Sequence, residues 1–184
     1  MSKKLILIIG APGAGKTTTA NLLAQKYPEK ISSYSTGELL KKETESGSVV
    51  GKIISDYLFK GQLVPTAIII DTVLDAIKAA PTDAVVIEGF PRKEKQVNIF
   101  GDVLFNHKEI ELLNVIEIQV SDEAAKARFQ GPEEMYENEM KNYKETIAEV
   151  EAYYRDHDLL KVVDGENPQD EVIAQIEAII QEKI

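Results

Sequence analysis

The sequence contains no cysteine, which excludes both a disulfide framework and a metal site built from thiolates. A chain without thiols suits a reducing compartment, so we expect a cytoplasmic protein. Long apolar runs are also missing, because the run near the N-terminus, Leu5–Ile9, stops at Gly10 after five residues. A membrane-spanning helix needs about 20 apolar residues and a signal peptide needs a longer apolar core, so we expect neither.

Positive charge is scarce as well. The chain has 21 lysines and arginines against 31 aspartates and glutamates, which gives a net charge of -10. Nucleic acids and acidic membranes both favour a basic protein face, and we therefore exclude them as partners. A small polyanion needs only a local cluster of donors, so an acidic protein can still bind a nucleotide.

No repeat, low-complexity stretch or Gly/Ser/Pro-rich linker divides the chain, and 184 residues suit one α/β domain covering 1–184. Short apolar runs predict strands at 5–9, 31–34, 84–87, 115–120 and 159–163. Helical patterns lie between them, near 15–26, 36–60, 66–79, 93–106, 122–156 and 168–182. This alternation predicts βαβ units, and hence a five-stranded parallel sheet with helices on both faces.

The stretch 133–156 has the clearest helical pattern. Its apolar residues recur at helical spacing and predict one buried stripe, made of Met135, Met140, Tyr143, Ile147, Val150 and Tyr154. Pro132 suits the start of a helix, and the two glutamates that follow it suit the positive helix N-terminus. We interpret the stripe as core packing.

The segment GAPGAGKT, residues Gly10–Thr17, fits the phosphate-binding pattern GxxxxGK[ST]. It directly follows an apolar strand and precedes a helical stretch, which is the context that the motif requires. Its glycines let backbone N–H groups wrap closely around phosphates, and the following helix adds its positive N-terminus. Lys16 supplies a mobile cation for the outer phosphates, and the Thr17 hydroxyl can reach a Mg²⁺ ion. The alternative is a glycine-rich turn with an incidental lysine.

A phosphate-binding loop alone leaves ATPase, GTPase and kinase functions open. Three further segments narrow the choice: STGELLK at Ser35–Lys41, GQLVP at Gly61–Pro65, and EGFPR at Glu88–Arg92 with Gln96 beyond it. Their sequences, order and spacing resemble those of the adenylate kinases, and Val163–Gly165 resembles the segment that borders the ATP base. The resemblance covers nearly the whole chain. It implies a P-loop NTPase fold with a small AMP-binding helical insert, about 35–64, and a shortened lid, about 129–135.

The family's site residues can be carried over position by position. The resemblance implies ATP contacts at Gly10, Gly13, Ala14, Gly15, Lys16, Thr17, Thr18, Arg128 and Gly165. It implies AMP contacts at Thr36, Lys41, Gln62, Leu63, Val64, Gly89, Arg92 and Gln96. It implies catalytic roles for Lys16, Arg92 and Arg128, and a Mg²⁺ accompanying ATP at Thr17 and Glu88. Four of these positions also have a plainer interpretation as structural or surface residues: Lys41, Glu88, Arg92 and Gln96.

The chain departs from the family at the lid. No arginine occurs between Arg128 and Arg155, and Glu139 stands where the family has a catalytic arginine. Phosphoryl transfer depends on cations that face the developing charge. Either a lysine takes the arginine's place, with Lys126, Lys141 and Lys144 as the candidates, or catalysis is slow.

The leading hypothesis is therefore an adenylate kinase in which Mg·ATP and AMP exchange a phosphoryl group to give two ADP, acting as a monomer. A nucleotide-binding protein whose kinase activity has decayed is the alternative that the arginine-free stretch favours. A kinase for another nucleoside monophosphate, such as UMP or CMP, ranks lower because Thr36 and Gln96 fit the adenine-reading pattern. Two histidines, His107 and His157, show no partner pattern and are expected at the surface.

Overall fold

The computed structural model describes residues 2–60 and 62–184. Its strands are β1 (Lys3–Gly10), β2 (Ile31–Ser35), β3 (Ala84–Glu88), β4 (Ile110–Gln119) and β5 (Leu160–Asp164). Its helices are α1 (Lys16–Lys26), α2 (Thr36–Glu45), α3 (Val49–Phe59), α4 (Thr66–Ala79), α5 (Glu94–Asn106), α6 (Asp122–Arg128), α7 (Glu133–Asp156) and α8 (Gln169–Ile180). The strands form one parallel sheet of five strands, as the sequence predicts, and the structure shows their order to be β2-β3-β1-β4-β5.

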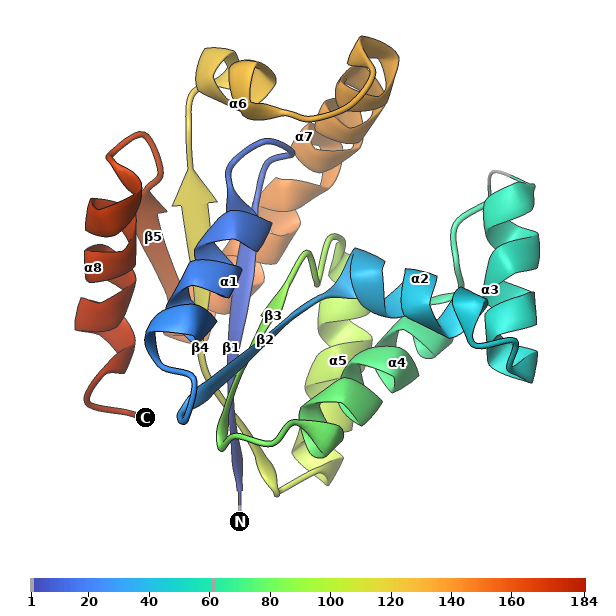
Figure 1. The fold of residues 1–184 in the computed structure, drawn as a ribbon, viewed down its shortest axis with the longest axis horizontal. Helices are drawn as coiled ribbons and strands as arrows, with labels where there is room; N and C mark the ends of the chain where they lie inside the picture. Colours follow the sequence, from blue (N-terminus) through green and yellow to red (C-terminus); the bar gives the residue numbers. More distant parts are fainter. Residues whose placement is uncertain (1, 61) are drawn as a thin grey trace.

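The central strand β1 is apolar throughout its second half because helices cover both faces of the sheet. Leu5, Leu7 and Ile9 face α4, α5 and α7, while Ile6 and Ile8 face α1 and α8. This two-sided burial explains why the strand reads as a continuous apolar run rather than an alternating one. Figure 1 shows α2 and α3 extending away from the sheet, and α6 beyond the carboxyl end of β4.

Two predicted helices are each divided in the structure. The stretch 36–60 breaks between α2 and α3 at Gly47, which has a φ of 72° that other residues rarely adopt. The stretch 122–156 breaks between α6 and α7, just before Pro132 caps the start of α7. Strand β4 also starts five residues earlier than predicted, at Ile110, because it pairs with β1 along its whole length.

The predicted apolar stripe of α7 is wrong at its first position. Met135 is 51% exposed, and the neighbouring Tyr136 is buried instead. The reason is that the first turns of α7 pack against α6 and the loop after β1, whereas later residues such as Val150 and Tyr154 pack on the sheet. The buried face therefore begins one residue later than a single uniform stripe would place it.

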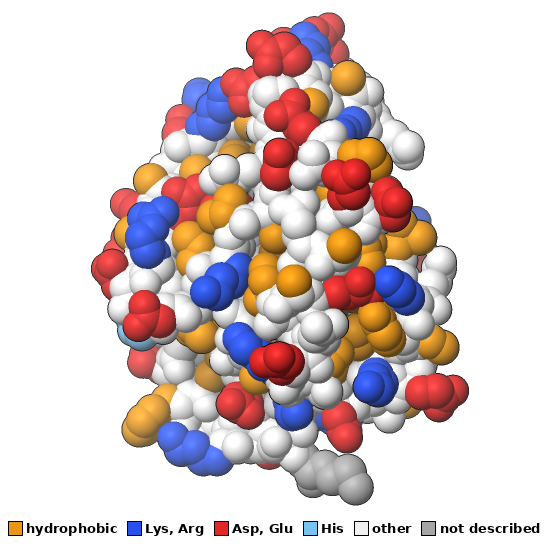
Figure 2. Space-filling model, turned by 90° about the vertical axis from the view of Figure 1, so that its left-hand side faces the viewer, with side chains coloured by type: hydrophobic (Ala, Val, Ile, Leu, Met, Phe, Trp, Pro, Cys, Tyr) orange, Lys and Arg blue, Asp and Glu red, His pale blue; other side chains and the backbone are white. Residues whose placement is uncertain are grey.

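Charges of both signs are interspersed with apolar side chains over the face drawn in Figure 2, so this face carries no extended basic patch. His107 is partly exposed and lies 2.9 Å from a Glu109 carboxylate oxygen, and His157 is exposed and stacks on Tyr153. Both histidines thus have local partners that the sequence did not reveal. Among the described residues, no helix combines the length and apolar character needed to cross a membrane.

The strand order creates a crevice at one point of the sheet. From β1 the chain moves to one side, to β2 and β3, and then crosses to the other side for β4 and β5. Ligands of open α/β sheets bind at such a reversal, outside the carboxyl ends of the strands. Here the crevice lies between β1 and β3, which end at Gly10 and Glu88.

Candidate active site

The loop that follows β1 has the backbone shape of a phosphate cup. Gly13 and Gly15 have φ angles of 84° and 89°, in the left-handed region that favours glycine. The space beside Gly13 is also closed, because an added Cβ would stand 2.1 Å from the carbonyl oxygen of Ala125. Helix α1 begins at Lys16 and directs its free N–H groups toward the cup.

The described residues form a hollow of about 360 Å³ on α7 and a larger one of about 790 Å³ beside the cup. The larger one contains every predicted ATP contact except Gly10, which ends β1: its lining includes Gly13, Ala14, Gly15, Lys16, Thr17, Thr18, Arg128 and Gly165. Arg128 closes one wall by donating from Nη1 to the Gly165 carbonyl at 2.7 Å. The structure therefore brings residues from three distant segments into one cavity.

The same hollow has lining residues that the sequence analysis did not identify: Thr19, Phe129, Gln130, Glu166, Asn167, Pro168, Gln169 and Val172. Gln169 reaches the start of α1, because its Nε2 donates to Thr19 Oγ1 at 3.0 Å. Only their closeness in the sequence to Thr18, Arg128 or Gly165 could have indicated them, since none belongs to a recognisable motif.

Lys16 is the central cation of the site. Its ammonium donates to the Ala11 carbonyl at 2.9 Å. Burial lowers the pKa of Lys16 from its ordinary value to about 8; Glu88 opposes this shift, Arg92 adds to it, and Glu139 opposes it. The side chain is therefore still charged at neutral pH. Lys16 thus lies within electrostatic range of the predicted acceptor-side arginine and of both acidic groups.

Thr17 and Glu88 meet where β1 and β3 end. The Thr17 hydroxyl donates to Glu88 Oε1 at 2.7 Å, and the Glu88 side chain is buried. Thr36, the first residue of α2, donates its hydroxyl to the Glu88 carbonyl at 3.0 Å. The end of β3 therefore connects the phosphate cup to the start of the α2–α3 segment, which is the predicted insert.

The segment after β3 folds back on itself around Gly89, whose φ is 80°. Arg92 donates from Nε to the Gly89 carbonyl at 2.8 Å, while its own backbone N–H donates to Gln96 Oε1 at 2.7 Å. The Gln96 side chain is buried, so its interpretation as a solvated helix residue is wrong. These bonds hold the guanidinium of Arg92 at the crevice and leave its terminal nitrogens available for a phosphate.

The remaining predicted AMP contacts lie on or beside the insert. Lys41 is exposed on α2, Gln62 is exposed, and Leu63 is 79% exposed, whereas Val64 is buried. Gly61, the first residue of the GQLVP segment, lies outside the described residues. The side chains of Lys41, Gln62 and Leu63 are thus exposed, whereas most of the predicted ATP contacts line one hollow with Lys16.

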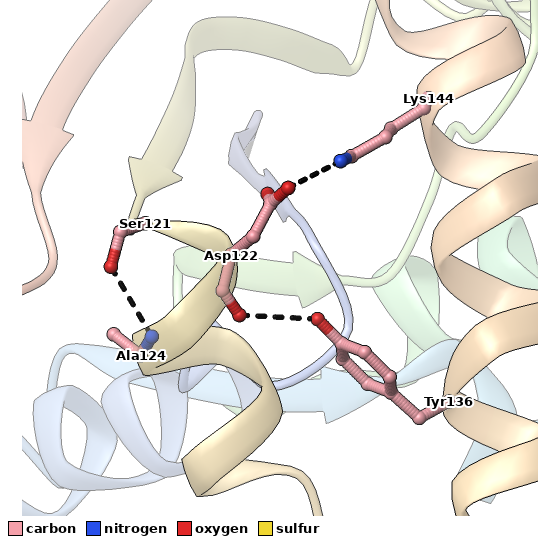
Figure 3. A network of polar contacts seen from close by, with 5 residues as sticks. All are labelled: Ser121, Asp122, Ala124, Tyr136 and Lys144. Carbon is pink, nitrogen blue, oxygen red and sulfur yellow. Dashed lines mark hydrogen bonds and ion pairs between the residues drawn. The ribbon is translucent and has the colours of Figure 1, made fainter.

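Two of the three lysines considered as arginine substitutes are engaged elsewhere. Lys126 pairs with Glu133 at 2.7 Å across the short α6–α7 connection. Lys144 pairs with Asp122, and Figure 3 shows this pair beside the Tyr136 hydroxyl, which donates to the Asp122 carbonyl at 3.3 Å. We call these three contacts the α6–α7 brace.

Glu139 lies on α7, within electrostatic range of Lys16 in the cup. It is half-buried, borders the smaller hollow of α7, and lies close enough to Lys16 to raise the pKa of that lysine. The resemblance assigns this position to a catalytic arginine, so the chain presents a negative charge where a positive one is expected. Lys141 remains exposed on α7 and has no ion pair among the described residues.

A buried carboxyl group lies beneath α7, and sequence analysis missed it. Glu117 on β4 is 2% exposed; its Oε1 accepts a hydrogen bond from Tyr143 at 3.3 Å, and its Oε2 lacks a hydrogen-bond partner among the described residues. Burial, and next Glu151, raise the pKa of Glu117 to about 7. A proton shared with Glu151 would satisfy the unpaired oxygen, because a protonated carboxyl donates.

Comparison with known proteins agrees with this geometry. The family model described as adenylate kinase matches residues 8–159. An adenylate kinase of Sulfurovum sp. (strain NBC37-1) is 42% identical over 99% of this chain and 100% of its own length. Those of Nautilia profundicola and Campylobacter jejuni (strain RM1221) are 42% and 43% identical, with 98% and 97% of each chain covered. The similarity extends from the phosphate cup to the segment Val163–Gly165, and this chain therefore belongs to the adenylate kinase family.

Proposed function

We propose that the protein transfers the terminal phosphoryl group of ATP to AMP and so forms two molecules of ADP. The observation that supports this most strongly is that the segments carrying Lys16 and Arg92 meet at the end of β3. Thr17, next to Lys16, donates to Glu88 Oε1 at 2.7 Å, and Arg92 donates to the adjacent Gly89 carbonyl at 2.8 Å. One cation belongs to the phosphate cup after β1 and the other to the segment after β3. A site with cations from both sides of the crevice suits two phosphate chains placed end to end.

Each named residue then has a defined task. Lys16 neutralises charge on the transferring group, Arg92 holds the acceptor phosphate in line, and Arg128 forms the wall beside the ATP base. No general base is required, because the attacking phosphate oxygen of AMP is already ionised at neutral pH. Catalysis therefore rests on positioning and on charge stabilisation.

The residues at the end of β3 fit a Mg²⁺ ion that accompanies ATP. Mg²⁺ prefers oxygen ligands and is usually held by one or two protein groups together with phosphates. The Thr17 hydroxyl and the Glu88 carboxylate lie 2.7 Å apart and provide such oxygens. When bound there, the ion would neutralise the β- and γ-phosphate oxygens.

Measurement of ADP formation with saturating ATP and AMP tests the proposal. Kinases typically turn over at about 1–100 s⁻¹. We expect a rate in the lower part of this range because Glu139 stands where the family has a catalytic arginine. Running the same assay with CMP, UMP and GMP as acceptors tests the choice of AMP. A preference for a pyrimidine nucleotide would contradict that choice.

The second candidate is a nucleotide-binding protein with little or no kinase activity. Glu139 beside Lys16, together with the ion pairs that occupy Lys126 and Lys144, favours it. Turnover below about 0.01 s⁻¹, far under the kinase range, combined with intact ATP binding would establish this function and reject phosphoryl transfer.

We further propose that residues 35–64 act as the mobile AMP-binding insert and residues 129–135 as a shortened lid, within one domain that works as a cytoplasmic monomer. The protruding α2 and α3 support the first assignment (Figure 1). Gel filtration of the purified chain with and without nucleotide tests the oligomeric state.

A further inference from the structure

The outer surface of the phosphate cup is packed directly against α6 and α7. The carbonyl oxygen of Ala125 in α6 occupies the position where a side chain at Gly13 would lie. Ala11, inside the cup motif, is buried in a small apolar cluster with Ala125, Tyr136 and Met140. Helix α6 and the first turns of α7 therefore contact the phosphate-binding loop itself.

Ala11 also contacts the central cation. Its carbonyl oxygen accepts the hydrogen bond from Lys16 Nζ at 2.9 Å. The side chain of Ala11 belongs to the same buried cluster as Tyr136, while its carbonyl oxygen holds the Lys16 ammonium. Any shift of Tyr136 that moves Ala11 will consequently move the carbonyl oxygen to which the Lys16 ammonium donates.

Tyr136 is held in place from several directions. It is 7% exposed, and its ring meets the edge of Phe129 at a centroid distance of 5.3 Å. Its hydroxyl donates to the Asp122 carbonyl at 3.3 Å, at the start of α6, where Ser121 caps the helix by accepting from the Ala124 N–H (Figure 3). Tyr136 thus connects the α6–α7 brace to the cup.

We propose that Tyr136 is a positioning residue for the phosphates of ATP. By fixing Ala11, it sets the place of the Lys16 ammonium, and the α6–α7 brace gives the cup its shape before nucleotide arrives. The inference rests on the proposed function in one respect, namely that ATP occupies this cup. It is independent of whether phosphoryl transfer is fast or slow, because it concerns binding.

The test compares two buried tyrosines of α7 by measuring ATP and AMP binding separately through calorimetry. Tyr154 is buried against the sheet and belongs to a different apolar cluster, so Tyr154→Ala is the matched control. We expect Tyr136→Ala to weaken ATP binding by about ten- to a hundredfold, because the cup would lose its shape before the nucleotide arrives and ordering it would oppose binding. AMP affinity should change by less than about twofold, because Arg92 and Gln96 are held by β3 and α5 rather than by α7.

Two milder variants keep the test decisive if Tyr136→Ala does not fold. Tyr136→Phe retains the ring and should bind ATP within about threefold of the wild type, while Tyr136→Leu loses the contact with Phe129 and should weaken ATP binding selectively. Unchanged ATP affinity in Tyr136→Leu, or an equal loss in Tyr154→Ala, would overturn the inference. If the wild-type chain bound no ATP at all, the proposed function itself would fail, which is a distinguishable result.

Discussion

The two halves of the proposed site are built differently. On the ATP side, the cup lies at the end of a buried strand, α6 packs against it, and the α6–α7 brace supports it. On the AMP side, the insert exposes large apolar side chains, including Phe59 at 92% and Leu63 at 79%. The first half is assembled by the same contacts that form the core, whereas the large apolar side chains of the second half have no such packing. We infer that rigid positioning serves ATP and movement of the insert serves AMP.

The largest effect is expected on the ATP side, from removal of the Lys16 ammonium. Lys16→Met should lower phosphoryl transfer by about 10²–10³-fold or more, the typical cost of losing one preorganised donor to the transition state. Lys26→Met is the matched control, because Lys26 lies on the same helix and pairs with Glu177 away from the cup. Steady-state assay of ADP formation checks this, and equal activity of the two variants would show that the cup is not the site of transfer.

The next largest effect is expected from replacing Glu139, which should increase the rate of phosphoryl transfer. Glu139→Arg replaces the negative charge near Lys16 with a positive one that can stabilise the transferring group. We expect turnover to rise by about ten- to a hundredfold, below the 10³–10⁵ that a fully positioned arginine supplies. Glu145→Arg makes the same charge change at an exposed position farther along α7. If Glu145→Arg raised turnover equally, a general effect of net charge would explain both results.

A smaller effect should appear on the AMP side. Leu63→Ala should raise KM for AMP by about three- to tenfold and leave KM for ATP unchanged. The substitution removes three carbon groups, each worth about 0.8 kcal/mol when fully buried, and we expect AMP to bury them only in part. This holds only if the exposed Leu63 becomes buried against AMP as the insert moves. Val49→Ala, at the far end of α3, is the control, and matching KM values for Leu63→Ala and wild type would indicate that the insert does not close over AMP.

The smallest effect concerns the support beneath α7. The pKa of Glu117 is about 7 in the folded state and has its ordinary value of 4.5 in the unfolded chain. Between these two pH values, Glu117 therefore keeps its proton when folded and releases it on unfolding. The unfolded state then binds fewer protons, so stability should fall as pH rises from about 4.5 to about 7 and then level off. Glu117→Gln should remove this fall and melt higher than wild type at pH 8, by about 2–4 °C for each kcal/mol that ionisation of the buried Glu117 costs.

Thermal unfolding between pH 5 and 8 measures this difference. Glu145→Gln serves as the control, since Glu145 is exposed on the same helix and its loss should leave the pH dependence of wild type in place. Parallel curves for wild type and Glu117→Gln would mean that Glu117 is ionised throughout this range.

Local pattern was sufficient to predict the sheet and the cup. Runs such as Leu5–Ile9 and Ala84–Ile87 are apolar because they are buried on both faces, so burial is visible in the sequence itself. The glycine spacing of Gly10–Thr17 reflects backbone angles that only glycine adopts easily, and these angles are present at Gly13 and Gly15. Both signals depend on the chemistry of neighbouring residues in the chain.

The sequence by itself therefore determined the parallel sheet, the position of the phosphate cup and the family. Tertiary structure alone decided that Tyr136 rather than Met135 is buried and that Lys126 and Lys144 are paired. It also decided that Glu117 lies under α7 with one carboxyl oxygen bonded to Tyr143 and the other without a hydrogen-bond partner among the described residues. The physical reason is that these outcomes depend on distant partners. Glu117 and Tyr143 are separated by 26 positions, and which charges meet is settled only when α6 and α7 pack on the loop that follows β1.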